Sequence, residues 1–330
     1  MRKEFEPSTL AAESLVSLGI TRAGKDMLTK EIRATITKQD VTVVIPTWNE
    51  AEAIGLVIDE VRECGYENIL VVDGYSTDGT PDIAAQKGAR VIDQTGQGKT
   101  GALATAARNV DTRFMLVMDG DFTYDPSYIE KMMVHGRSYD EVIGARTNGR
   151  KNIPSLNRLG NRILSWFFNV LFAVPLTDVC SGMYLLSTEA ARRLEFTTGG
   201  FDVEVEIAAQ FADGGRVAEV PIKYRSRVGR QKLSSLRHGI TIGLSILRLA
   251  NLHNPVLLYG MFIALTGIPA FAILAWVAYE QVYHAIWHAS YALFGMMLLV
   301  LALQSFAVAT LSVLIKRSEH RIYQTLKESY

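Results

Sequence analysis

The sequence predicts an α/β domain with a largely parallel sheet, followed by two helices long enough to span a membrane. Between residues 41 and 146, short β-branched or apolar runs alternate with segments of helical pattern. This alternation is typical of strand–helix–strand units. Farther along, residues 255–315 contain only one Asp, Glu, Lys or Arg, which is Glu280. Two apolar runs result, about residues 256–279 and 291–315, each long enough to cross a hydrocarbon core of about 30 Å as a helix.

The predicted elements of the first region follow one another at short intervals. Strands are expected at residues 41–46, 68–73, 89–93, 113–119 and 141–146. Helices are expected at residues 50–64, 80–88, 100–110 and 125–136. Ligands of such sheets bind beyond the carboxyl ends of the strands, so the polar residues at those ends are the first candidates for function.

Charge balance, cysteine content and the N-terminal residues each exclude one class of protein. The 330 residues carry 34 basic and 34 acidic side chains, so net charge gives no indication of nucleic-acid binding. Cys64 and Cys180 are far apart and form no metal-binding spacing, which favours two reduced thiols. The N-terminal residues lack an apolar run, so no cleavable signal peptide is expected.

The chain divides into five predicted parts. They are a helical N-terminal extension (1–40), a domain with a basic amphipathic helix near residues 154–172 (41–230), a second amphipathic helix (231–254), two transmembrane helices (255–315) and a tail (316–330). Basic amphipathic helices beside membrane spans are typical of the membrane interface. Lys and Arg flank the spans but are missing from the connector between them, which predicts that the domain and both termini are cytoplasmic.

A glycine-rich stretch at residues 96–101 fits two phosphate-binding motifs in part. Its Gly-x-Gly-x-x-Gly spacing is that of a dinucleotide-binding loop, and Gly98-Lys99-Thr100 is the tail of a P-loop. The P-loop also needs a glycine where this chain has Asp93, whose charge would face the phosphates. A dinucleotide-binding loop normally opens the first unit of its domain, whereas two units precede this one. Neither motif accounts for the loop by itself.

Four successive predicted strands end in polar motifs. The first ends in Pro46-Thr47-Trp48-Asn49-Glu50 and the second in Asp73, while the third leads to Gly98-Lys99 and the fourth to Asp119-Gly120-Asp121. In this order the motifs resemble those of family 2 glycosyltransferases, which have the GT-A fold. The resemblance covers about residues 41–227. Within the family, the amphipathic helices and two spans are similar to polyprenyl-phosphate hexosyltransferases of the dolichol-phosphate-mannose synthase type.

The resemblance implies a role for each group of residues. Donor binding falls on Pro46, Thr47, Asn49, Glu50, Asp73, Gly98, Lys99, Gly120 and Asp121. Asp119 and Asp121 would hold Mg²⁺ or Mn²⁺, which stabilises a diphosphate leaving group as a Lewis acid, and with Arg146 they are the candidate catalytic residues. The acceptor phosphate would be bound by Arg146, Arg158, Arg162, Arg227 and Lys232, since a guanidinium fork matches phosphate. The sugar pocket would include Asp178, Asp202 and Glu204.

The implied activity is inverting transfer of a hexose from a GDP- or UDP-sugar to polyprenyl (dolichyl) phosphate at the cytoplasmic membrane face, giving a lipid-linked donor for glycan assembly. Such an acceptor is already deprotonated, so little need for a general base is expected. Transfer to another lipid such as diacylglycerol, or to a growing glycan, stays open, as does a membrane-anchored nucleotide-binding scaffold without turnover. None of the four tryptophans follows an arginine, so the Gln-x-x-Arg-Trp motif usual in processive synthases is missing. The sequence identifies neither the sugar nor the base.

Overall fold

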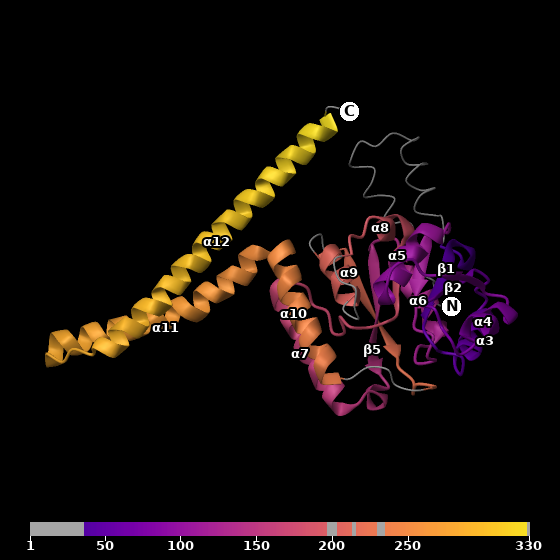
Figure 1. Ribbon diagram of the computed structural model, residues 1–330, viewed down its shortest axis with the longest axis horizontal. Coiled ribbons are helices and arrows are strands. Elements are labelled where there is room, and N and C mark those ends of the chain that lie inside the picture. Colours follow the sequence, from indigo (N-terminus) through magenta and orange to yellow (C-terminus); the bar gives the residue numbers. More distant parts are fainter. Residues whose placement is uncertain (1–35, 197–202, 213–215, 230–234, 329–330) are drawn as a thin grey trace, which may run out of the picture. The chain divides into compact units, whose positions relative to one another are not determined.

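The computed structural model describes residues 36–196, 203–212, 216–229 and 235–328 (Figure 1). The chain divides into two units, residues 1–38 and residues 39–330. The predicted helical extension at residues 1–40 lies almost entirely outside the described residues, so the fold concerns the second unit.

A seven-stranded sheet forms the centre of this unit, in the order β3-β2-β1-β4-β6-β5-β7. Its strands are β1 (Val41–Thr47), β2 (Ile69–Asp73), β3 (Arg90–Asp93), β4 (Phe114–Val117), β5 (Glu141–Asn148), β6 (Tyr184–Ser187) and β7 (Val217–Lys223). All pairings are parallel except those of β6, which runs antiparallel to both β4 and β5. The predicted largely parallel sheet is therefore confirmed, and the carboxyl ends of β1 to β4 meet at one edge.

Helices connect the strands and continue beyond the sheet. They are α3 (Ile54–Glu63), α4 (Thr80–Gln86), α5 (Gly98–Asn109), α6 (Ile129–His135), α7 (Ser155–Phe172), α8 (Thr188–Arg192), α9 (Val203–Ala212), α10 (Ser235–His253), α11 (Pro255–His284) and α12 (Ala289–Glu328). Short 3-10 turns are η2 (Lys38–Asp40), η3 (Pro126–Tyr128) and η4 (Arg150–Asn152).

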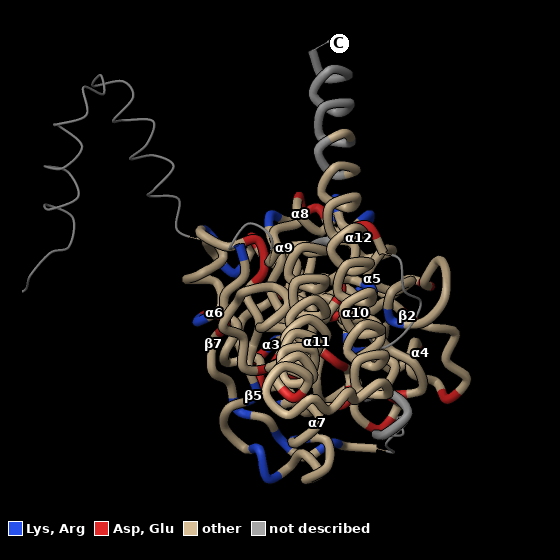
Figure 2. The backbone as a smooth tube through the Cα atoms, turned by 90° about the vertical axis from the view of Figure 1, so that its left-hand side faces the viewer, with Lys and Arg blue, Asp and Glu red and all other residues tan. Residues whose placement is uncertain are grey.

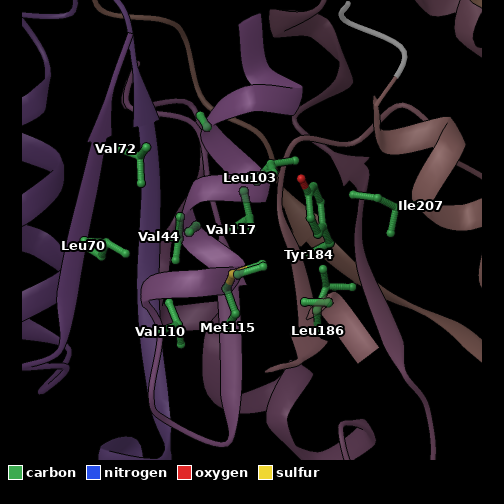
Figure 3. Close-up of a cluster of buried hydrophobic side chains, with 14 of the residues drawn as sticks. Val44, Leu70, Val72, Leu103, Val110, Met115, Val117, Tyr184, Leu186 and Ile207 are labelled. Atoms are coloured by element: carbon green, nitrogen blue, oxygen red, sulfur yellow. The ribbon is translucent and has the colours of Figure 1, made fainter. Parts of the chain in front are cut away.

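The main core lies between the sheet and helices α5 and α9 (Figure 3). Alternate residues of one strand point to the same face, so Met115 and Val117 of β4 lie on the face covered by Leu103 of α5. On the opposite face of β1, Ile45 lies near Ile54 of α3, whose buried side chains recur at the three- and four-residue spacing of one helix face. Burial on both faces explains why β1 is almost continuously apolar. The core thus fixes the strand ends that carry the polar motifs.

Helices α7 and α10 pack against each other and against α9 in a second core. Phe168 and Leu171 of α7 and Ile246 of α10 are fully buried there, and Leu258 at the start of α11 joins them. The other face of α7 exposes Leu156, Leu159, Ile163 and Trp166, and α10 exposes Ile240 and Leu244. Among the described residues, both helices therefore keep an apolar stripe exposed. Their predicted location in the membrane interface remains a prediction.

Helices α11 and α12 are long and apolar enough to cross a membrane, with mean hydropathy of 2.1 and 2.3 over their candidate spans. Only 11% and 6% of these windows are buried, so their side chains mostly face outward. The two helices contact each other, and at two points a glycine faces the partner helix, with Gly267 near Ala302 and Gly295 near Leu274. Outward-facing apolar surface of this length supports membrane anchoring.

Candidate active site

The ends of β1 and β2 form one hydrogen-bonded unit around Asp73. This carboxylate is only 1% exposed. Its Oδ1 accepts from the hydroxyls of Thr47 (3.1 Å) and Ser76 (2.6 Å), and its Oδ2 accepts from the Ser76 amide (2.7 Å). Asn49, at φ 53°, accepts from the Thr77 amide at 2.8 Å. Asp73 and Asn49 therefore fix the shape of the two loops that are predicted to bind the donor.

The glycine-rich loop leads from β3 into α5 and orients Lys99. A β-carbon on Gly101 would lie 2.8 Å from the carbonyl carbon of Gly96, so the loop closes on itself only with glycine there. Lys99 lies in the first turn of α5, and its Nζ is 2.6 Å from both Asp119 Oδ1 and Glu204 Oε1. Burial opposes the charge of Lys99, but the two carboxylates outweigh it and raise the pKa of the ammonium above its ordinary value.

Asp121 also faces a cationic side chain. Its Oδ1 accepts from the amide and hydroxyl of Thr123, and its Oδ2 lies 3.1 Å from Nη1 of Arg227. Arg227 also reaches Glu50, whose Oε1 is 2.6 Å from Nη2. Burial and the charge of Asp119 raise the pKa of Asp121, against the opposing effects of Thr123 and Arg227. Each carboxylate of the Asp-x-Asp motif is thus paired with one cation.

Two carboxylates are a partial ligand set for a divalent metal. Within the described residues, no group of three or more His, Cys, Asp or Glu side chains could hold an ion. Mg²⁺ is commonly bound by one or two carboxylates together with substrate phosphates and water, so Asp119 and Asp121 fit a metal that arrives with a diphosphate. The lysine and arginine beside them indicate that this location requires positive charge.

A cavity of about 280 Å³ lies where β5 leads through η4 into α7. Its lining includes Arg146, Arg150, Arg158, Arg162 and the single acidic residue Asp178. Figure 2 shows Lys and Arg segments gathered near the end of β5 and α7. Such a surplus of guanidinium groups is suited to a phosphate.

Arg146 is bound firmly to the wall of this cavity. Its Nε and Nη2 donate to the two oxygens of Asp178 at 2.6 and 2.7 Å, and Nη2 also donates to the Cys180 carbonyl. Burial disfavours the Asp178 charge, but Arg146 and Asn161 hold the pKa of this carboxyl below its ordinary value. Arg158 and Arg162 are solvent-exposed.

Comparison with known proteins identifies the family of this chain. The model of glycosyl transferase family 2 matches residues 42–193. Glycosyltransferase AglJ of Haloferax volcanii is 33% identical over 286 residues, which cover 84% of this chain and 94% of that protein. The chain belongs to glycosyl transferase family 2. A dolichyl-phosphate hexose transferase of the same organism is 36% identical over 64% of this chain and 94% of its own length.

The solved structures confirm the fold. Glucosyl-3-phosphoglycerate synthase from Mycobacterium tuberculosis, crystallised with Mn²⁺, UDP-glucose and phosphoglyceric acid, matches with a TM-score of 0.54 and 22% identity. The match covers 64% of this chain and 79% of that one. The GT-A architecture expected from the sequence is thereby confirmed, and the chain is a glycosyltransferase.

The glycosyltransferase distributes its predicted site residues over two locations. Arg146, Arg158 and Arg162 line one cavity, and their shared acceptor role stays a prediction. Arg227, grouped with them from the sequence, lies instead between Glu50 and Asp121. The sugar-pocket candidates also separate. Asp178 binds Arg146 in the arginine-lined cavity, while Glu204 binds Lys99 beside Asp119. Asp202 and Lys232 lie outside the described residues.

Three further residues at the site were not singled out from the sequence. A β-carbon on Gly182 would lie 2.3 Å from Asp119 Oδ2, so this glycine makes room for the carboxylate. Trp48 and Tyr75 follow β1 and β2 and are 53% and 63% exposed, and Tyr75 adopts φ 62° while its hydroxyl donates to the Gln94 carbonyl. Aromatic residues within otherwise polar strand-end loops were the available signal.

Proposed function

We propose that this glycosyltransferase transfers a hexose from a nucleotide sugar to a polyprenyl phosphate. The main support for this proposal is the arginine-lined cavity at the start of α7. The same helix exposes an apolar face. A phosphate acceptor on a lipid needs both features, cations for its headgroup and apolar contact for its chain. The similarity to a dolichyl-phosphate hexose transferase supports the same acceptor class.

The donor is assigned to the strand ends. Exposed aromatic rings such as those of Trp48 and Tyr75 are suited to stacking on a nucleobase. The buried Asp73 holds the loops that carry them, and Glu50 offers carboxylate oxygens to base or ribose donors. A GDP- or UDP-hexose is the proposed donor class.

Asp119 and Asp121 would hold Mg²⁺ or Mn²⁺ through donor phosphates, and the bound ion would supply Lewis-acid stabilisation of the leaving diphosphate. Lys99 orients Asp119, because its ammonium bridges that carboxylate to Glu204 on α9. Binding of Mn²⁺ and UDP-glucose by the mycobacterial synthase of similar fold supports this assignment.

The reaction is a direct displacement at the sugar. An oxygen of the acceptor phosphate forms a bond to the anomeric carbon as the bond from that carbon to the nucleoside diphosphate breaks, with inversion. The acceptor is already deprotonated, so no side chain has to remove a proton. Arg158 and Arg162 would bind the acceptor phosphate, while Arg146, paired with Asp178, would shape the cavity and add its positive field.

The proposed location is the cytoplasmic face of a membrane. Helices α11 and α12 would span the bilayer, with α7 and α10 in the interface, and Lys and Arg flanking the spans would remain inside. This orientation places the catalytic domain where sugar nucleotides are made.

The test is a transfer assay with the full chain in membranes. Radiolabelled GDP-mannose, UDP-glucose and UDP-N-acetylglucosamine are each incubated with dolichyl phosphate or with diacylglycerol, and the lipid is extracted. Label in lipid only when dolichyl phosphate is present supports the proposal. Equal labelling of diacylglycerol, or nucleotide release without labelled lipid, would refute it.

A further inference from the structure

Arg227 occupies an unusual place, because it joins a donor-side carboxylate to the Asp-x-Asp motif. Its guanidinium lies 2.6 Å from Glu50 and 3.1 Å from Asp121. Exposed fractions of the three side chains are 26%, 12% and 9%, so the contacts are largely shielded from water. Shielded charge pairs of this kind interact more strongly than exposed ones.

The backbone holds Arg227 in this position. The segment 224–228, which we call the strap, runs beside residues 121–124. A β-bridge joins Tyr224 to Tyr124, and the amides of Arg225 and Val228 donate to the carbonyls of Thr123 and Asp121. Arg225 anchors the strap further through a bidentate pair with Glu60 at 2.8 and 2.7 Å. Because the strap is fixed on both sides of Arg227, this residue can leave Asp121 only by rotating its side chain.

Arg227 and a divalent cation would compete for the same atom of Asp121, its Oδ2. Oδ1 already accepts two hydrogen bonds from Thr123, and Oδ2 faces Arg227. A divalent cation that binds Oδ2 must therefore replace the guanidinium. The Glu50 contact is the shorter of the two, so Arg227 can keep Glu50 as a partner while it releases Asp121.

We infer that Arg227 is a positioning residue whose guanidinium occupies the cation site at Asp121 until the donor binds. This inference rests on the proposed function. A cation alone has to displace an arginine from its carboxylate, which weakens its binding. A nucleoside diphosphate brings anionic oxygens that can accept the displaced guanidinium, so cation and diphosphate bind cooperatively. By linkage each strengthens the affinity for the other by the same factor.

The experiment measures Mn²⁺ binding by the full chain in detergent, using the electron paramagnetic resonance signal of free Mn²⁺. Titrations are made alone and with saturating UDP or GDP. The wild type should bind Mn²⁺ at least about 5-fold more tightly with the diphosphate, at the lower end of usual coupling. Arg227→Met should bind Mn²⁺ alone at least about 5-fold more tightly than the wild type and lose most of the cooperativity.

Three controls make the outcome specific. Asp121→Asn should lose the Mn²⁺ signal change, which assigns it to this site. Arg227→Lys keeps a cation on the strap and should stay near the wild type in binding Mn²⁺ alone. Arg193→Met removes one positive charge from a surface pair with Glu189 and should leave both titrations unchanged.

Two different results would overturn the assignments. Unchanged or weaker binding of Mn²⁺ alone by Arg227→Met, in a wild type that binds Mn²⁺ with a diphosphate, refutes the role of Arg227 only. A wild type that binds no Mn²⁺ with either diphosphate refutes the metal site of the proposed function, and the inference with it.

Discussion

Gly182 lies so close to Asp119 that a β-carbon at this glycine would be 2.3 Å from the carboxylate Oδ2. Its amide donates to the hydroxyl of the buried Tyr124 at 2.7 Å, so the backbone cannot easily withdraw. A side chain at position 182 must therefore push Asp119 away from its position beside Lys99.

Gly182→Ala should lower the transfer rate by about 100-fold, the order of loss that a misplacement of about 1 Å causes. Turnover is measured as labelled lipid formed per minute. Gly260→Ala is the matched control, because a β-carbon there would meet nothing within 4 Å beyond the neighbouring backbone of its own helix. A Gly182→Ala protein with wild-type turnover would show that the position of Asp119 does not matter.

The sequence predicted the first five strands of the sheet and missed the last two. Strands β1 to β5 correspond to predicted runs within a few residues. Strand β6 has four residues, and β7 alternates polar and apolar residues with a proline inside. Both strands are stabilised by their neighbours in the sheet rather than by their own propensity, since β6 lies between β4 and β5 and β7 pairs with β5.

Motifs on single loops could also be predicted from the sequence, whereas contacts between residues far apart in the chain could not. The residue types at Asp119, Asp121 and Lys99, each beside a strand end, are enough to indicate phosphate and metal chemistry. The Lys99–Glu204 pair joins residues 105 positions apart, and the Arg227–Glu50 pair joins residues 177 apart. Such pairs depend on how residues 224–228 and helix α9 pack beside the strand ends, which local pattern does not encode.

Removal of the metal or of its main ligand should stop turnover. Asp121→Asn keeps the shape of the side chain but loses its charge, so the rate should fall at least about 100-fold, as when a preorganised electrostatic group is lost. EDTA should abolish wild-type transfer, and added Mg²⁺ or Mn²⁺ should restore it. Full activity in EDTA would remove the metal from the mechanism.

The Arg146–Asp178 pair should make stability depend on pH only in the acid range. Asp178→Asn leaves a buried guanidinium without its counter-ion, so the free energy of unfolding should fall by about 3–5 kcal/mol at pH 7. The pKa of Asp178 is lowered in the folded protein, so the contribution of its charge is complete above the ordinary value of 3.8 and is lost as pH falls through the lower folded value.

The difference in unfolding between wild type and Asp178→Asn should therefore be constant from pH 7 to about pH 5 and shrink only below the ordinary carboxyl pKa. Unfolding of the full chain in detergent is followed by tryptophan fluorescence. A difference that already shrinks between pH 7 and 5 would mean that the pKa of Asp178 is not lowered.

Membrane topology can be tested at the connector between α11 and α12. A cysteine in place of Ser290 should react with an impermeant thiol reagent added to intact cells, since the connector is expected outside. Native Cys64, in the catalytic domain, should react only after the cells are permeabilised. Reaction of Cys64 in intact cells, with protection of position 290, would reverse the proposed orientation.

Arg158 and Arg162 should act on the lipid acceptor and not on the nucleotide. They lie four residues apart on α7, so they share one helix face and line one cavity. The exposed Ile163 and Trp166 on the same helix belong to its apolar stripe, which would bring the two guanidinium groups to headgroup level. Residues predicted to bind the donor, such as Asp73 at the end of β2, do not line this cavity. Arginine loss should therefore weaken binding of the lipid phosphate while the affinity for the nucleoside diphosphate stays nearly unchanged.

The measurement is a pair of titrations on Arg158→Ala and Arg162→Ala. Apparent affinity for dolichyl phosphate is taken from the transfer assay, and affinity for the nucleoside diphosphate with Mg²⁺ from calorimetry. Each variant should lose at least about 10-fold in lipid affinity, the order expected when a charge-assisted hydrogen bond worth about 1.5–3 kcal/mol is removed. Lysine at either position should restore the affinity only in part, because a point charge lacks the planar fork. If both alanine variants lose the nucleotide and keep the lipid affinity, the arginine-lined cavity belongs to the donor.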